Sequence, residues 1–362
     1  LPVPASIDEI DLEALAAAMN AQQQGGMPDF KQMVRLQRFL LEADADAVAA
    51  LMARAADLDL GDAARKSLLA QLVQALAQKD PRRALDLAFS SPHLDVADRT
   101  WAYTSGFTGW MKKDPATALA WFDEKIAAGG FTSKSIDGRS LARIRFEAAA
   151  LGHLLGSDPA RARERLEALP EEHRREILQQ GHLLKVNRET EAAFAALVRE
   201  TLPADLQARA YASHAHALVR RDGFQGVGEF LETIEATPAE RQAIAAQAAN
   251  NKLMESGRKR QLPGAADLAE LRAFAEGQAP AATEVITGEA LAHFAYSSGM
   301  FEETAGLIRD LHAGNPNDDI LVGFLQQSRF MSDRGAARDL AALITDPARR
   351  AAVLEKLEPP AP

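Results

Sequence analysis

The sequence predicts an all-α protein, and three observations support this fold class. Strong helix formers, namely alanine, leucine, glutamate, glutamine and arginine, dominate most windows of the 362-residue chain. Alternating runs of valine, isoleucine and threonine bounded by turn residues, which would predict strands, are almost absent. An aspartate followed by proline recurs along the chain, at Asp80-Pro81, Asp114-Pro115 and Asp158-Pro159.

The Asp-Pro pair predicts the start of a helix. The aspartate side chain can accept hydrogen bonds from the free N–H groups of the first turn, and proline at the next position lacks only an N–H that would be unpaired anyway. Starts near residues 46, 80 and 114 lie 34 residues apart. Later starts are expected near residues 158, 190, 222, 264, 301 and 333. Such a period predicts stacked helical hairpins, because each pair of helices buries its apolar face only against its neighbours.

The first elements follow from local signals. Ser6 with Glu9 matches the spacing of a capping box and predicts a helix through Asn20, and the Gln- and Gly-rich stretch 21–28 predicts a flexible break. The next helices are expected at 29–42, 48–58 and 63–78, before the Asp-Pro starts take over.

The predicted organisation is a lead-in at residues 1–28, one helical array at 29–355 and a short proline-rich, disordered tail at 356–362. Two connecting segments are longer than the rest, the Gly-rich stretch 129–140 and the basic stretch 255–264, and both predict surface loops. If the array is not continuous, it is expected to break near 257–264.

Composition excludes several classes of function. The net charge of −10 argues against a general nucleic-acid binder, which needs a basic surface to displace counterions from phosphates. No stretch approaches the roughly 18 consecutive apolar residues of a membrane-spanning helix. With no cysteine, disulfides and cysteine zinc sites are excluded. The chain begins with Leu1 instead of methionine, which fits removal of an export leader, with a cytoplasmic location as the alternative.

The recurring unit resembles that of divergent tetratricopeptide-repeat proteins, over about residues 30 to 355. In that family the second helix of each pair starts with a turn, an aspartate, an aromatic residue or proline, two polar residues, an alanine and a leucine. Most units here lack the family's leading tryptophan and several lack its glycine. The start pattern is matched at 79–85, 113–119 and 299–305, and more loosely at 221–227. A large residue follows the alanine by four positions at Phe122, Leu166 and Phe230, and Pro238 closes a unit.

The resemblance implies a right-handed superhelix whose concave groove is lined by the first helix of each pair. By position, the groove residues are Tyr103, Phe107 and Trp110, at i, i+4 and i+7 on one helical stripe, and Tyr211 in a later unit. An exposed aromatic stripe favours peptide binding, because such side chains bury a large area at little cost in entropy. The alternative is that the stripe packs between hairpins as core.

Basic clusters suggest a second surface. Arg139, Arg143 and Arg145 follow the Gly-rich stretch and predict a patch for an acidic peptide or a phosphate. The alternative is a solvated face whose charges are neutralised locally. The next helix has both the additional cations and the neighbouring carboxylates, at Arg161, Arg163, Arg165, Glu164 and Glu167.

Catalytic and metal-binding motifs are absent from the sequence. His214 and His216 are two residues apart on a predicted helix, so their side chains diverge by about 200° and cannot share a metal without a distortion of the helix. There is no phosphate-binding P-loop, no dinucleotide fingerprint and no nucleophile elbow, so no cofactor is expected.

The favoured function is a non-catalytic scaffold that binds a protein or peptide in its groove. The alternatives are an accessory domain of a cell-wall-processing system, in which Trp101, Trp110 and Trp121 stack on sugar rings, or an enzyme with an unrecognised site. The sequence leaves the partner and the oligomeric state open.

Overall fold

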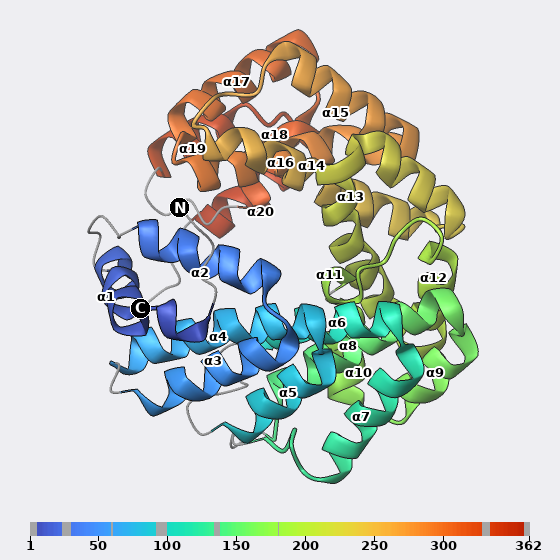
Figure 1. Cartoon of the computed structure of the whole chain (residues 1–362). Coiled ribbons are helices and arrows are strands. Elements are labelled where there is room, and N and C mark those ends of the chain that lie inside the picture. The colour runs from blue at the N-terminus through green and yellow to red at the C-terminus, as the bar shows by residue number, and fades with distance from the viewer. Residues whose placement is uncertain are drawn as a thin grey trace. The chain divides into compact units, whose positions relative to one another are not determined.

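A computed structural model describes residues 6–23, 30–58, 61–91, 100–133, 138–179, 181–327 and 334–357. Every regular element within these ranges is a helix and none is a strand, which confirms the all-α class (Figure 1). Among these helices, none combines the length and apolar character needed to cross a membrane. The chain divides into two compact units, Leu1–Leu166 and Glu167–Pro362.

In the first unit, helices that follow one another in sequence pack together. Helix α3 packs on α4, α4 on α5 and α6, and α6 on α7 and α8. The elements are η1 (Ile7–Glu9), α1 (Leu12–Gln23), α2 (Phe30–Glu42), α3 (Ala45–Asp57), α4 (Asp62–Lys79), α5 (Pro81–Ser90), α6 (Thr100–Lys113), α7 (Pro115–Ala127), α8 (Leu141–Ser157) and α9 (Pro159–Glu167), at whose end the unit boundary falls.

The three Asp-Pro helix starts are confirmed. The carboxylates of Asp80, Asp114 and Asp158 each accept a hydrogen bond from the backbone N–H three residues later, at 3.0, 3.2 and 3.1 Å. Proline occupies the first helical position of α5, α7 and α9. The side chain and the proline together fix where each helix begins.

The predicted first helix start is wrong. Ser6 makes no side-chain cap and precedes only the short 3₁₀ turn η1, after which Ile10 is extended, with φ −90° and ψ 111°. Helix α1 begins at Leu12, where the Asp11 carboxylate accepts the N–H of Ala14 at 2.9 Å. The carboxylate of Asp11, which follows the buried Ile10, therefore sets where α1 begins. The predicted break at 21–28 lies largely outside the described residues, although α1 continues to Gln23.

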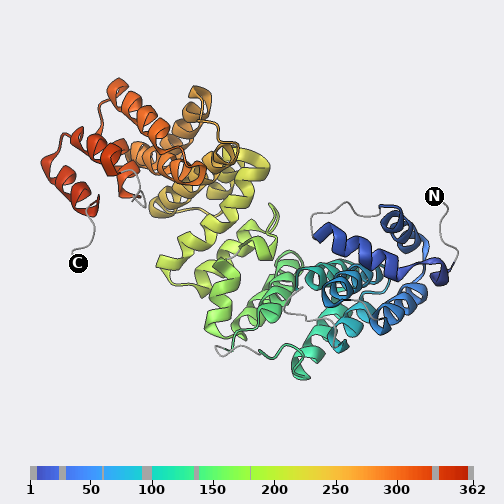
Figure 2. The ribbon, with the colours of Figure 1, turned by 90° about the vertical axis from the view of Figure 1, so that its left-hand side faces the viewer.

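In the second unit, the long helices pack in series, α13 on α14, α14 on α16 and α16 on α18. Figure 2 shows these yellow to red helices side by side. The elements are α10 (Glu171–Gln179), α11 (Gly181–Leu184), α12 (Glu191–Thr201), α13 (Ala204–Thr233), α14 (Pro238–Arg258), α15 (Ala265–Gln278), η2 (Pro280–Ala282), α16 (Thr283–Ser298), α17 (Phe301–Gly314), α18 (Asp318–Gln326), α19 (Arg334–Ala342) and α20 (Pro347–Leu357).

The later helix starts agree with the expected positions where the structure describes them. Thr190 is the N-cap residue of α12, α15 begins at Ala265 and α17 begins at Phe301. The start expected at Asp222 coincides with a break inside α13, where Gly223 has φ +66° and ψ −159°. The start expected at residue 333 lies outside the described residues. The tail is predicted at 356–362, but α20 continues to Leu357, so its first two residues are helical, and the rest of it lies outside the described residues.

The basic segment 257–264 lies within the second unit, which extends on both sides of it. Helix α14 before it packs on α15 and α16 after it. The loop is also shorter than predicted, since α14 continues to Arg258.

Helices α16 and α18 approach each other until their backbones touch. A Cβ atom added at Gly288 would collide with the carbonyl oxygen of Ile320, and one added at Gly323 would collide with that of Val285. Only glycine fits at these two positions without a shift of one helix.

Candidate functional site

The aromatic stripe of α6 lies in the interior of the first unit. Tyr103 and Phe107 are 0% exposed and Trp110 is 6% exposed. The Phe107 ring centroid lies 5.4 Å from that of Phe122 and 5.0 Å from that of Phe146. The prediction that this stripe lines an open groove is therefore wrong. Packing the rings against α7 and α8 removes their apolar surface from water, and this burial stabilises the folded chain.

Tyr211, the fourth predicted groove residue, is also buried. It is 0% exposed, and its hydroxyl donates a hydrogen bond to the carbonyl of Ala195 at 3.1 Å. Burial raises the pKa of Tyr211 to about 12, because the charged phenolate would lose its hydration. This side chain packs α13 against α12.

Two of the three predicted sugar-stacking tryptophans lie in the interior. Trp110 and Trp121 are both buried, and the Trp121 indole N–H donates to the Asp86 carboxylate at 2.9 Å. The side chain of Trp101 lies outside the described residues.

The predicted basic patch is partly neutralised by acidic side chains. Arg143 Nε lies 3.8 Å from the Glu147 carboxylate, and Arg165 lies 2.6 Å from Glu147 and 2.8 Å from Asp123. Burial raises the pKa of Glu147, although the two guanidinium groups oppose this rise. Arg143 is thus half-buried beside a buried carboxylate.

The other two arginines of that patch differ in exposure. Arg139 is exposed and its carbonyl accepts a hydrogen bond from the Ser133 hydroxyl at 2.8 Å, whereas Arg145 is half-buried on α8. Local neutralisation, which the sequence left open, involves Glu147 and Asp123 and not the expected Glu164 and Glu167.

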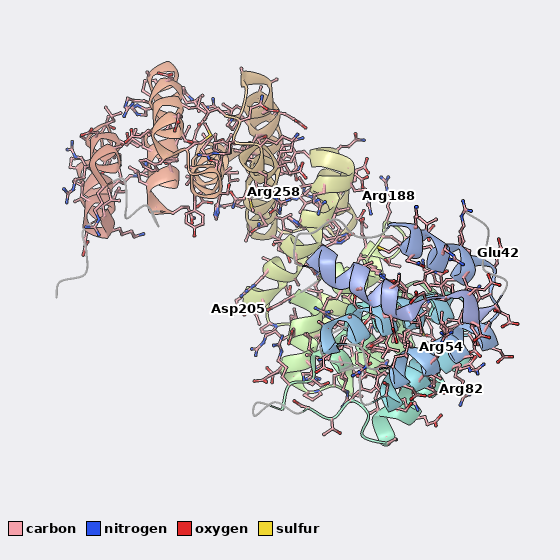
Figure 3. All side chains as sticks on the ribbon, turned by 60° about the vertical axis from the view of Figure 1, so that its left-hand side comes forward. Glu42, Arg54, Arg82, Arg188, Asp205 and Arg258 are labelled. Carbon is pink, nitrogen blue, oxygen red and sulfur yellow. The ribbon has the colours of Figure 1, made fainter. Side chains whose placement is uncertain are left out.

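A groove of about 730 Å³ opens on the second unit, between α10, α13 and α14. Figure 3 labels Asp205, in the first turn of α13, and Arg258, at the end of α14. We call this hollow the α13 groove, and its lining residues are Gln179, Arg209, Ala212, Ser213, His216, Ala217, Arg220, Arg221 and Gln247.

The floor of the α13 groove is one face of a helix. Arg209, Ser213, His216 and Arg220 follow one another at i, i+4, i+7 and i+11, which places them in one stripe along α13. The opposite face is buried and consists of Ala210, Tyr211, His214, Ala215 and Leu218.

The two histidines of α13 separate as predicted. His214 is buried, with Nε2 3.4 Å from the Glu191 carboxylate, while His216 is exposed in the α13 groove. The part of the chain that the structure describes contains no group of three histidine, aspartate or glutamate side chains arranged for a metal ion.

The lining of the α13 groove is cationic. It includes three arginines and a histidine but no carboxylate, and Arg209 has no ion-pair partner within the described ranges. The acidic neighbours lie outside the lining: Asp222 is 2.7 Å from Arg221, and Glu255 is 3.7 Å from Arg220. The hydrogen bond that Arg221 donates to the Asp222 carboxylate raises the pKa of Arg221.

A smaller hollow of about 390 Å³ adjoins the α13 groove and shares Gln179 and Arg209 with it. Its other lining residues are Glu172, Arg175 and Glu176, so its charge is mixed. The cationic surface is therefore centred on α13, and carboxylates approach it at the α10 end.

The α13 groove is a site that the sequence interpretation missed, although Tyr211 on the same helix was selected. The signal that could have revealed it is the polar stripe at i, i+4, i+7 and i+11 on a helix whose other face is apolar. In comparisons with protein-family models, curated proteins and solved structures, the chain had no match.

Proposed function

We propose that this chain is a helical-repeat scaffold, similar to tetratricopeptide-repeat proteins, and that it binds a protein segment in the α13 groove. Two observations support a repeat architecture. The Asp-Pro starts recur and are capped in the same way, and helices that follow one another pack together in each unit. In this proposal residues 204–222 of α13 are the first helix of a pair, and they supply most of the groove lining.

The observation that carries the proposal is the chemistry of the α13 groove. Ala212 and Ala217 are small, which leaves room for the backbone of a bound segment. Gln179 on α10 and Gln247 on α14 flank the stripe, and a carboxamide can both donate to and accept from a peptide backbone. The volume, about 730 Å³, lies in the range of typical ligand-binding pockets.

The glycan-binding alternative has less support. It requires exposed tryptophan faces, and the two tryptophan side chains that the structure describes, Trp110 and Trp121, are buried. No observation on the described residues favours an enzymatic reaction over binding, so binding is the function we propose.

The test is a selection of peptides from a random display library on the immobilised full-length chain. Selected peptides are then titrated against two variants that add the same indole at exposed helical alanines. Ala217→Trp fills the α13 groove, and Ala273→Trp on α15 adds an indole outside it. Circular dichroism confirms that both variants stay as helical as the wild type.

We expect the selected peptides to bind the wild type and Ala273→Trp equally. Ala217→Trp should weaken binding by about tenfold or more, because the indole occupies space that the peptide needs. A tenfold loss corresponds to about 1.4 kcal/mol of binding free energy. Equal binding by all three proteins would show that the α13 groove is not the binding surface.

A further inference from the structure

Resting on the proposed function, we propose that the ligand of the α13 groove is an extended acidic segment of a protein. Two of its carboxylates, about five residues apart, pair with Arg209 and Arg220 at the two ends of the stripe.

The charge of the groove is opposite to that of the chain. The whole chain has a net charge of −10, with 51 acidic and 41 basic residues excluding histidine. Among the described residues, the lining of the α13 groove nevertheless has three arginines and no carboxylate. A guanidinium group binds a carboxylate through two parallel hydrogen bonds, so this lining selects acidic side chains over neutral ones.

The guanidinium groups at the ends of the stripe are available to a ligand. Arg209 has no ion-pair partner among the described residues, and Arg220 has only Glu255, at 3.7 Å, with both side chains more than half exposed. Exposed pairs at this distance contribute little to stability, so a ligand carboxylate can replace Glu255. Arg221 is less available, because Asp222 holds it at 2.7 Å.

The helix fixes the spacing of the two anchors. Arg209 and Arg220 are separated by 11 positions on one helix, which at 1.5 Å per residue corresponds to about 16.5 Å along α13. An extended chain advances by about 3.3 Å per residue and covers this distance in about five residues. Ser213 and His216 lie between the anchors and face the ligand backbone.

The test uses fluorescein-labelled nine-residue peptides of glycine, serine and alanine with two variable positions. The first peptide has glutamate at its second and seventh positions, the second has glutamine at the same positions, and the third has two adjacent glutamates. Fluorescence anisotropy with the full-length chain at low ionic strength, about 20 mM, limits screening of the charges.

Three arginine variants identify the anchors. Arg209→Gln and Arg220→Gln each remove one anchor, and Arg188→Gln is the matched control. Arg188 also lies in the second unit, is 72% exposed and pairs with Glu229, and neither of these two residues lines the groove. Each of the three variants removes one positive charge from the second unit.

We expect the spaced-glutamate peptide to bind most tightly and to bind roughly fivefold more weakly to each anchor variant, but unchanged to Arg188→Gln. Equal binding of the glutamine peptide would overturn the acidic ligand, and equal binding of the adjacent-glutamate peptide would overturn the spacing. If display instead selects neutral peptides that Ala217→Trp blocks, this inference fails while the proposed function stands. If Ala217→Trp leaves every peptide bound, both fail.

Discussion

Two helices of this chain have stripes with the same spacing and opposite environments. On α6, Tyr103, Phe107 and Trp110 occupy i, i+4 and i+7 and are buried. On α13, Arg209, Ser213 and His216 occupy the same relative positions and line an open groove. The spacing establishes only that three side chains share a face. Which side of the helix is buried depends on their chemistry and on the helices that pack against them.

The largest expected difference between the two stripes is in stability. Phe107→Ala removes a ring packed against Phe122 and Phe146 and should lower the free energy of unfolding by about 3–5 kcal/mol. Arg209→Ala, at an exposed position, should change it by less than about 0.5 kcal/mol. Urea unfolding followed by circular dichroism measures both. Similar losses from the two variants would mean that the stripes do not differ in environment.

The interior faces of α6 and α16 are packed differently. Aromatic rings fill the space beside α6, whereas the backbone of α18 lies directly against α16. Gly288→Ala places a methyl group against the Ile320 carbonyl and should cost about 1–3 kcal/mol of stability. Gly306→Ala on α17 is the control, because a Cβ there meets nothing within 4 Å. It should stabilise the helix by roughly 0.5–1 kcal/mol. If Gly288→Ala is as stable as the control, α16 and α18 do not pack this closely in solution.

The smallest expected effect is a difference between two buried carboxylates in how their contribution to stability depends on pH. Asp318 accepts hydrogen bonds from the backbone N–H groups of Thr345, at 2.9 Å, and of Asp346, at 2.9 Å. Burial alone would raise the pKa of Asp318, but these hydrogen bonds outweigh it and lower that pKa. In the first unit, burial raises the pKa of Glu147 despite its arginine partners.

These opposite pKa shifts predict opposite pH dependences. The stability that Asp318 contributes is present above its unfolded-state pKa, about 3.9, and is lost as pH falls through the lower folded-state pKa. For Glu147 the contribution is complete below the unfolded-state pKa and declines as pH rises through the higher folded-state value. Between about pH 3 and 6, the cost of Asp318→Asn, about 1 kcal/mol, should therefore grow with pH.

The cost of Glu147→Gln should shrink over the same range of pH. Unfolding free energies of the wild type and the two variants, measured in urea at each pH, give both trends. Parallel trends would contradict the assigned shifts.

Local signals in the sequence predicted the helices well, because a cap such as Asp114 acts within one turn. Ser6 is the exception, since Asp11 five residues later provides the cap that α1 uses. The burial of Tyr103 and Tyr211 could not be read from spacing, because it depends on α7, α8 and α12. The α13 groove could not be read from the stripe alone for the same reason, because Gln179 and Gln247 come from two other helices, α10 and α14, whose packing against α13 forms the groove.

The central claim is that the stripe on α13, and not the stripe on α6, is the binding surface. The most direct measurement is photocrosslinking of the spaced-glutamate peptide with a benzophenone at its centre, followed by mass spectrometry of the digested chain. Crosslinks within residues 209–221, or in the helices of Gln179 and Gln247, are the predicted result. Crosslinks concentrated on α6, or lying outside these three helices, would contradict the claim.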